Sequence, residues 1–212
     1  MEKRIEDYKI IKIGDKEYPN RLSKIKNAPE TLYVKGDYSL LNKLSIAIVG
    51  SRKCDEYGKI QAKRFASYLS QKNICIISGL ATGIDTMAHL YSMENEGKTI
   101  AVIASGFEHI YPTENKILFE KILENGGAIV SEYEQSTEID MRKFPIRNRI
   151  ISGLSAGVLV VEARIKSGSM ITGRLAIKQN KELFCIPRRS NKYSLRRNKW
   201  INIRRSDVCN FA

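Results

Sequence analysis

Ser45-Ile-Ala-Ile-Val-Gly-Ser-Arg52 is the stretch of sequence that decides the fold of this chain. Its apolar, β-branched run is typical of a strand buried on both faces, and the pattern that follows from Asp55 is helical. Glycine lets the backbone approach a ligand, a helix start offers free N–H groups, and arginine adds a charged fork that suits phosphate. An anion site is therefore expected at Gly50, Ser51 and Arg52. Its phosphate could belong to a nucleotide or to a nucleic-acid backbone, and the alternative is that the turn binds no ligand.

Short apolar runs alternate with amphipathic helical stretches along the rest of the chain. The expected strands are residues 32–34, 46–49, 74–77, 100–104, 128–130, 158–161 and 183–186, and the expected helices are 55–71, 85–95, 114–124, 145–154 and 170–179. Strands that are continuous in Ile and Val and separated by helices predict a mainly parallel sheet covered on both faces. The pattern therefore predicts a doubly wound α/β fold, whose ligand lies beyond the carboxyl ends of the strands.

Three parts are expected along the chain. Residues 45–187 form the main domain, 1–44 form an N-terminal extension that packs on it, and 188–212 form a basic tail. The chain carries 36 basic and 23 acidic residues, a formal net charge of +13. Eight basic residues against one acid give 187–212 a charge of +7, which leaves +6 for the rest. A basic chain favours a polyanionic partner, most simply nucleic acid, and the alternative is a solvated surface.

The remaining composition indicates the compartment. No run of about 18 apolar residues occurs, so no membrane span is expected. The N-terminal stretch Met1-Glu-Lys-Arg-Ile-Glu-Asp7 is too charged for a signal peptide. Four cysteines lie far apart without metal-ligand spacing. These features predict a cytoplasmic protein with neither a membrane nor a metal partner.

A second glycine-rich loop, Ser78-Gly-Leu-Ala-Thr-Gly-Ile-Asp85, follows the next strand and opens a helix. It has neither the spacing of the dinucleotide fingerprint nor the Lys-Ser/Thr pair of a P-loop. Its N–H groups can still face a phosphate. The alternative, favoured when the loop is taken alone, is a tight turn in which Asp85 supports the helix start.

Phe144-Pro-Ile-Arg-Asn-Arg149 is a more specific signal. Pro145 suits the first helical position, and Phe144 just before it can stack on a base. Arg147 and Arg149 lie about 200° apart around a helix, so they cannot share a face. One is expected at the ligand groove and the other toward the structure or a neighbouring chain. The alternative is a hydrophobic staple with salt bridges, but Arg142-Lys143 upstream favours the groove.

Other motifs indicate structure more than chemistry. In Lys166-Ser-Gly-Ser-Met-Ile-Thr172, Ser167 and Ser169 are expected to cap a helix whose N-terminus can also hold an anion. His89 and His109 are expected to be structural, because no nucleophile elbow, H-E-x-x-H motif or carboxylate cluster accompanies them. No catalytic residue and no cofactor are expected.

The ordered motifs resemble those of the DNA-processing protein A (DprA/Smf) family. They are Tyr18-Pro19, Ala28–Gly36, Ala47–Arg52, Tyr57-Gly58, Ser78–Asp85 with Ala88-His89, Gly106, Tyr111-Pro112, Asn115, Ser131-Glu132, Phe144–Ile151, Glu162-Ala163 and Ser167–Ser169. Together they cover roughly residues 18–187. The resemblance implies an extended Rossmann-like fold and a cytoplasmic homodimer that binds single-stranded DNA without chemistry. It also implies that the protein protects incoming strands and loads the RecA recombinase onto them in natural transformation.

Carried onto this chain, the resemblance implies a DNA-binding pocket. The candidate residues are Gly50, Ser51, Arg52, Gly79, Ala81, Thr82, Gly83, Arg142, Lys143, Phe144, Arg147, Asn148, Ser167 and Gly168. Many members carry a winged-helix module, and none is expected within these 212 residues. Where the family has glycines after Pro187, this chain has Arg188, Arg196-Arg197 and Arg204-Arg205, which is either divergence into a basic arm or a degraded sequence. The net charge lies largely there, so it counts less toward nucleic acid.

Two other functions are compatible with such a crevice. One is an enzyme or sensor of a small nucleotide, of the nucleoside-monophosphate hydrolase type. Those proteins carry a Pro-Gly-Gly-x-Gly-Thr segment with a following catalytic Glu, which this sequence lacks. The other is a protein-interaction scaffold without a ligand.

Overall fold

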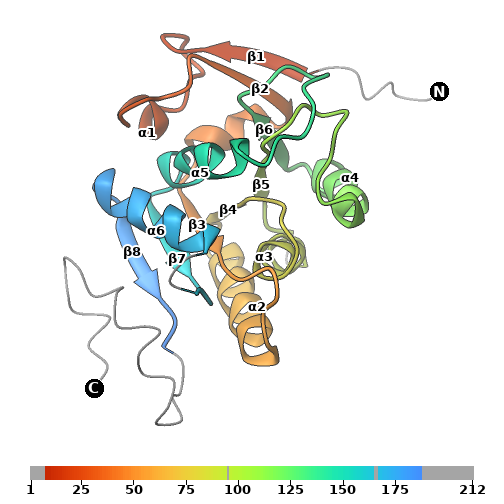
Figure 1. Cartoon of the computed structure of the whole chain (residues 1–212), viewed down its shortest axis with the longest axis vertical. Coiled ribbons are helices and arrows are strands. Elements are labelled where there is room, and N and C mark those ends of the chain that lie inside the picture. Colours follow the sequence, from red (N-terminus) through yellow and green to blue (C-terminus); the bar gives the residue numbers. More distant parts are fainter. Residues whose placement is uncertain (1–7, 95, 165–166, 188–212) are drawn as a thin grey trace.

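The computed structural model describes residues 8–94, 96–164 and 167–187, which build one eight-stranded sheet flanked by helices (Figure 1). The strands are β1 (Tyr8–Lys12), β2 (Thr31–Gly36), β3 (Ser45–Val49), β4 (Cys75–Ser78), β5 (Thr99–Val102), β6 (Ala128–Ser131), β7 (Gly157–Val160) and β8 (Glu182–Cys185). The helices are α1 (Asn20–Ser23), α2 (Glu56–Gln71), α3 (Ile84–Met93), α4 (Lys116–Glu124), α5 (Lys143–Leu154) and α6 (Gly168–Lys178), with short 3-10 turns η1 (Tyr38–Asn42) and η2 (Thr113–Asn115).

The strand order is β1-β2-β6-β5-β4-β3-β7-β8. From β6 to β8 all neighbours are parallel, whereas β1 and β2 join one edge as antiparallel strands. The chain runs outward from β3 to β6 on one side, then returns through α5 to β7 on the other side of β3. This reversal is the topological switch of a doubly wound fold, and it confirms the predicted class. The crevice for a ligand is expected at the carboxyl ends of β3 and its neighbours.

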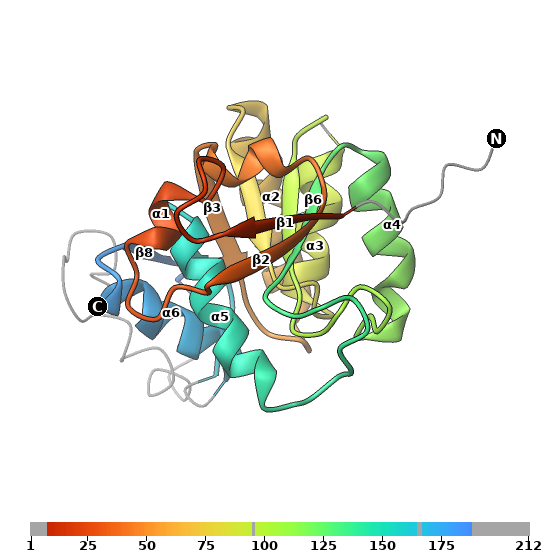
Figure 2. The same ribbon diagram turned by 90° about the horizontal axis from the view of Figure 1, so that it is seen from above.

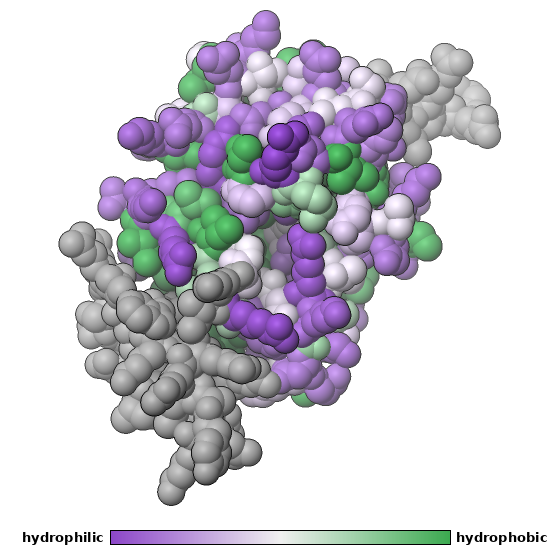
Figure 3. Space-filling model, viewed as in Figure 1, coloured by the Kyte–Doolittle hydropathy of each residue, from purple (hydrophilic) through white to green (hydrophobic). Residues whose placement is uncertain are grey.

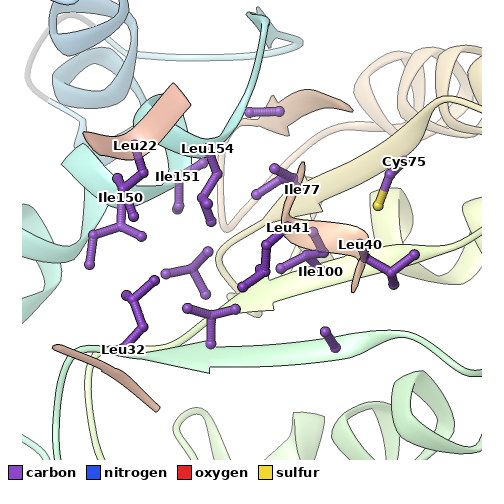
Figure 4. Close-up of a cluster of buried hydrophobic side chains, with 14 of the residues drawn as sticks. Leu22, Leu32, Leu40, Leu41, Cys75, Ile77, Ile100, Ile150, Ile151 and Leu154 are labelled. Atoms are coloured by element: carbon purple, nitrogen blue, oxygen red, sulfur yellow. The ribbon is translucent and has the colours of Figure 1, made fainter. Parts of the chain in front are cut away.

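Helices cover both faces of the sheet (Figure 2). In β5, Ile100 and Val102 belong to a core cluster with residues of α1, η1, α5 and α6, and Ala101 between them belongs to a cluster with residues of α4. A third cluster joins Ile48 and Ile76 to α2 and α3. Figure 4 shows the first cluster, in which side chains of α1, η1 and α5 meet those of the central strands. The strands β4 to β7 are therefore buried along their whole length, as their continuous apolar runs predict.

The N-terminal stretch adds structure that the sequence pattern did not predict. Tyr8–Lys12 forms β1, which is the edge strand of the described sheet. β2 pairs with β6, so this stretch extends the main sheet. The division of the chain into three parts stays a prediction, and the basic tail 188–212 lies outside the described residues. No helix in the described part is long and apolar enough to cross a membrane.

The predicted element boundaries agree with the structure to within two residues, and one difference bears on the site. α5 begins at Lys143, so Phe144 lies inside the first helical turn and not before it, and Pro145 is the third helical residue. A proline is tolerated there because the first N–H groups of a helix have no intrahelical acceptor. The expectation that Pro145 opens the helix was wrong by one half-turn.

Shortening Ile100 tests the central packing. Ile100 has no exposed surface, so Ile100→Ala is expected to lower the free energy of unfolding by about 2–5 kcal/mol. Ile117→Ala is the matched control, because that side chain on α4 is 69% exposed and its loss should change stability by less than about 0.5 kcal/mol. Urea denaturation of the full chain measures both. Equal losses in the two variants would contradict the packing described.

Candidate nucleic-acid interface

The loops at the carboxyl ends of β3 and β4 lie directly against each other. Ile84, the first residue of α3, donates its N–H to the carbonyl of Ser51 over 3.1 Å. Gly83 has a φ of +79°, and a Cβ there would lie 2.3 Å from the Ser51 carbonyl oxygen and 2.6 Å from that of Arg52. The two glycine-rich loops that the sequence singled out therefore form one surface. Figure 3 shows this face of the molecule, which is hollowed near its centre between α5 and α3.

The first loop presents its charges to solvent. Arg52 and Lys53 are exposed, and Ser51 Oγ accepts the N–H of Lys53 over 3.2 Å. Asp55 caps α2 by accepting the N–H of Gly58 over 2.9 Å, and its own N–H donates to Glu162 Oε2 over 3.1 Å. The loop is thus held at its C-terminal end, while the Arg52 side chain is exposed.

The ring of Phe144 contacts both Arg52 and Tyr111. The guanidinium carbon of Arg52 lies 5.7 Å from the ring centroid of Phe144, within the range of a cation–π contact. The ring of Tyr111 lies edge-on to Phe144, with 5.5 Å between the centroids. Tyr111 is 39% exposed and was missed as a site residue. Its place in the loop after β5, beside the predicted crevice, was the signal that could have identified it.

Arg147 does not reach the groove surface. It is 4% exposed, and its Nη1 donates to the carbonyls of Gly79, over 2.8 Å, and of Val102. Arg149 pairs with Glu132 and donates from Nε to the carbonyl of Asn27 over 2.9 Å. Neither arginine of the pair is fully exposed, because Arg147 is buried and Arg149 is half-buried against Glu132 and Asn27, so a DNA contact by Arg147 stays a prediction. The two side chains leave α5 in different directions and have different partners, as their spacing predicts.

Asp85 is the buried counterpart of Arg147. Its Oδ2 accepts the N–H of Gly79 over 3.1 Å, so it holds the loop and not only the helix start. Burial raises the pKa of the Asp85 carboxyl, and the nearby charge of Arg147 opposes that rise. Burial lowers the pKa of Arg147 to about 10, and Asp85 counteracts it. Each group stabilises the charged form of the other, in a buried position where either charge alone would carry a large desolvation penalty.

The basic pair before α5 is held by neighbours in the chain. Arg142 makes a two-pronged contact with Asp140, with Nη2 2.9 Å from Oδ2, and its side chain is largely exposed. Lys143 Nζ lies 4.6 Å from the ring centroid of Tyr133 and donates to the carbonyl of Glu138 over 3.3 Å. Both cations therefore flank the start of α5, beside Phe144.

The remaining candidates connect α5 to α6. Asn148 Nδ2 donates to the carbonyl of Gly168 over 3.1 Å. Ser167 Oγ accepts the N–H of Met170 over 3.4 Å and lies 2.9 Å from Ser169 Oγ. The expected helix cap by Ser167 is present. As DNA contacts, Asn148, Ser167 and Gly168 stay predictions, as do the other candidate residues.

Nothing in the described residues assembles a metal site of three or more His, Cys, Asp or Glu side chains. His89 is fully buried in α3, with its Nδ1 2.7 Å from Thr99 Oγ1. The Thr99 hydroxyl already donates to the carbonyl of Ile76 over 2.8 Å, so His89 must donate from Nδ1. This bond anchors His89 in the core, while its buried Nε2 has no partner among the described residues, and the structural role stays a prediction.

Fold and groove together define a Rossmann-like, doubly wound protein whose strand ends combine an exposed arginine, two aromatic rings and a glycine-rich helix start. Such a site suits a ligand with both phosphates and flat rings. The chain belongs to the DNA recombination-mediator protein A family, whose model matches residues 9–205. This match confirms the resemblance that the ordered motifs indicated.

Relatives and solved structures agree with this membership. The DNA processing protein DprA of Bacillus subtilis is 44% identical over 178 residues, which cover 84% of this chain and 60% of that protein. The structure of DNA processing protein A from Streptococcus pneumoniae has a TM-score of 0.82 at 40% identity and matches 90% of this chain and 66% of its own. That of Helicobacter pylori, described for a single-stranded DNA binding mode, has a TM-score of 0.79 at 34% identity, over 87% and 83%. The chain thus spans less than two thirds of the Bacillus protein.

Adding a methyl group to Gly83 tests the contact between the two loops. Gly83→Ala places a side chain at positive φ and against two carbonyl oxygens, so a loss of about 1–3 kcal/mol in the free energy of unfolding is expected. Gly168→Ala is the control, since a Cβ there meets nothing within 4 Å. Thermal and urea denaturation should leave the control within about 0.5 kcal/mol of the parent. A parent-like Gly83→Ala would show that the loops are not in contact.

The protonation of His89 gives a pH dependence with a definite sign. Burial lowers the pKa of His89 to about 3. Below a pH of about 6.5, the ordinary pKa of histidine, the unfolded chain therefore binds a proton at His89 that the folded chain does not. As the pH is lowered further, the free energy of unfolding falls by up to about 1.4 kcal/mol for each pH unit. NMR of the ring nitrogens should show a neutral His89, protonated at Nδ1, from pH 7 to about 4. The same chain in urea serves as the reference, and titration of folded His89 near 6.5 would refute this prediction.

Proposed function

We propose that this chain binds single-stranded DNA in the groove at the carboxyl ends of β3 to β5 and acts as a recombination mediator. One observation carries the proposal: Phe144 lies between the exposed Arg52 guanidinium and the ring of Tyr111, at the rim of a glycine-rich helix start. A single strand offers phosphates to the cation and the N–H groups, and bases to the rings. Membership of the recombination-mediator family and the Helicobacter pylori relative, described for its single-stranded DNA binding mode, support it.

The mediator role extends this binding. In the proposal the protein is a cytoplasmic homodimer that protects incoming strands and passes them to a RecA recombinase during natural transformation. It performs no chemistry on the DNA. The sequence motifs that resemble the family support this part of the proposal.

Removing the exposed arginine tests the groove. Arg52→Ala is expected to weaken binding to all single-stranded sequences alike and to reduce the log–log salt slope of binding by about 0.7, the value of one phosphate contact. The matched control is Arg64→Ala on α2, which removes the same exposed charge away from the groove. Fluorescence anisotropy of labelled oligo-dT with the full chain, over a salt titration, measures both.

The same assay distinguishes the alternatives. A slope and affinity for Arg52→Ala that match the control would exclude the groove as the DNA site. If a free mononucleotide at modest concentration displaced the oligonucleotide, the site would be that of a small-nucleotide enzyme or sensor. A parent chain that binds neither ligand would be a protein-interaction scaffold.

A further inference from the structure

Arg147 occupies an unusual position for a residue of a DNA groove. Its side chain is buried beneath the ends of two adjacent parallel strands. Ser78 of β4 pairs with Ala101 of β5, and the residues that follow them are Gly79 and Val102. One nitrogen of Arg147, Nη1, donates to both of their carbonyls. The guanidinium also lies against Gly79, where a Cβ would come within 2.7 Å of Nη2. Arg147 therefore links the first residue after β4 to the last residue of β5.

Gly79 is held from both sides. Its carbonyl accepts from Arg147 and its N–H donates to Asp85, so a buried pair of opposite charges fixes the point where the loop leaves the sheet. The next two carbonyls are also held from inside the protein. Leu80 accepts from Asn115 Nδ2 over 2.8 Å, and Ala81 accepts from Thr86 Oγ1 over 2.8 Å. Three successive carbonyls thus face side-chain donors of the interior.

This arrangement determines where the N–H groups of the loop point. In a trans peptide the C=O and the following N–H point in opposite directions, so the N–H of Thr82 points away from Thr86. Within the described residues, neither Thr82 N–H nor Gly83 N–H donates a hydrogen bond. Both precede α3, whose N-terminus carries a partial positive charge. These donors remain for a ligand phosphate only while the carbonyls stay fixed behind them.

The geometry points to Arg147 as a positioning residue of the phosphate-binding loop, which acts by holding the Gly79 carbonyl and not by touching DNA. This inference rests on the proposed function for the identity of the ligand. It reassigns Arg147, which the motif resemblance implies as a DNA contact, and it adds Asp85, Asn115 and Thr86 as supports of the loop. Arg52 is left as the exposed arginine of the groove.

Two variants on one helix separate positioning from contact and from general stability. Arg147→Met removes the strand-end bridge. Arg149→Met makes the same chemical change two residues further on, where the arginine pairs with Glu132 instead. We expect Arg147→Met to raise the Kd for oligo-dT about tenfold, as expected for the loss of one or two fixed donors. The salt slope should stay that of the parent, because no phosphate-contacting cation is lost. Arg149→Met should keep the parent Kd.

Amide hydrogen exchange measures how firmly the loop is held in the absence of DNA. The amides of residues 79–83 should exchange faster in Arg147→Met than in the parent, and at the parent rate in Arg149→Met. A parent chain that fails to bind oligo-dT would overturn the proposed function, while the exchange result would still decide the role of Arg147. Unchanged exchange, or a salt slope reduced by about 0.7 as for a lost phosphate contact, would overturn the positioning role.

Two further variants keep the test decisive if Arg147→Met does not fold. Arg147→Met leaves the Asp85 carboxylate buried without its counter-charge, so Arg147→Met combined with Asp85→Asn removes both charges and keeps an acceptor for Gly79 N–H. It should show the same faster exchange and the same loss of affinity. Arg147→Lys keeps the positive charge and its N–H donors on one nitrogen but loses the planar guanidinium that packs against Gly79. It should restore part of the affinity, and a full loss equal to Arg147→Met would count against positioning.

Discussion

Five neighbouring strands, from β6 to β7, have both faces covered by apolar side chains, and this constraint determines where the protein can place polar chemistry. Any polar side chain on the body of these strands would have to be matched inside a dry core. The ends of the strands are the nearest positions at which backbone groups leave the ladder and side chains reach water. The turn at Arg52, the loop from Gly79 to Gly83 and the start of α5 all lie at one such end. The site is therefore a consequence of how fully the sheet is buried.

The strand ends carry two layers of polar groups with different tasks. The outer layer consists of Arg52 and the ring of Tyr111, and both side chains are exposed to solvent. The inner layer consists of Asp85 and Arg147, which both bond the backbone of Gly79, and Arg147 also bonds the end of β5. Phe144 lies between the layers, because the guanidinium carbon of Arg147 is 6.0 Å from its ring centroid. An exposed cation can follow a flexible ligand, whereas a buried one fixes the frame against which that ligand is held.

Sequence reasoning predicted the central elements because their signals are strong. The apolar runs of β3 to β8, with amphipathic helices between them, predict a parallel sheet that is covered on both faces. β1 was missed because only Ile11 of its five residues is buried, so no alternation is visible. The burial of Arg147 was not predicted, for a different reason. Residue spacing determines the angle between Arg147 and Arg149, but not how deeply α5 lies between α6 and the strand ends. Tyr111 depends likewise on a loop path that no periodic pattern describes.

The edge strand β1 has a consequence for the behaviour of the protein in solution. An edge strand offers unpaired backbone groups to any other strand, and it can seed sheet-to-sheet association. Here Lys9 and Lys12 flank the half-exposed Ile10 on this edge. Lys9 is further fixed by Glu17, over 3.0 Å, and by the ring of Tyr38, 3.9 Å from its Nζ to the centroid. Charged side chains on an edge strand disfavour such pairing, so we expect these lysines to oppose the addition of a further strand at β1.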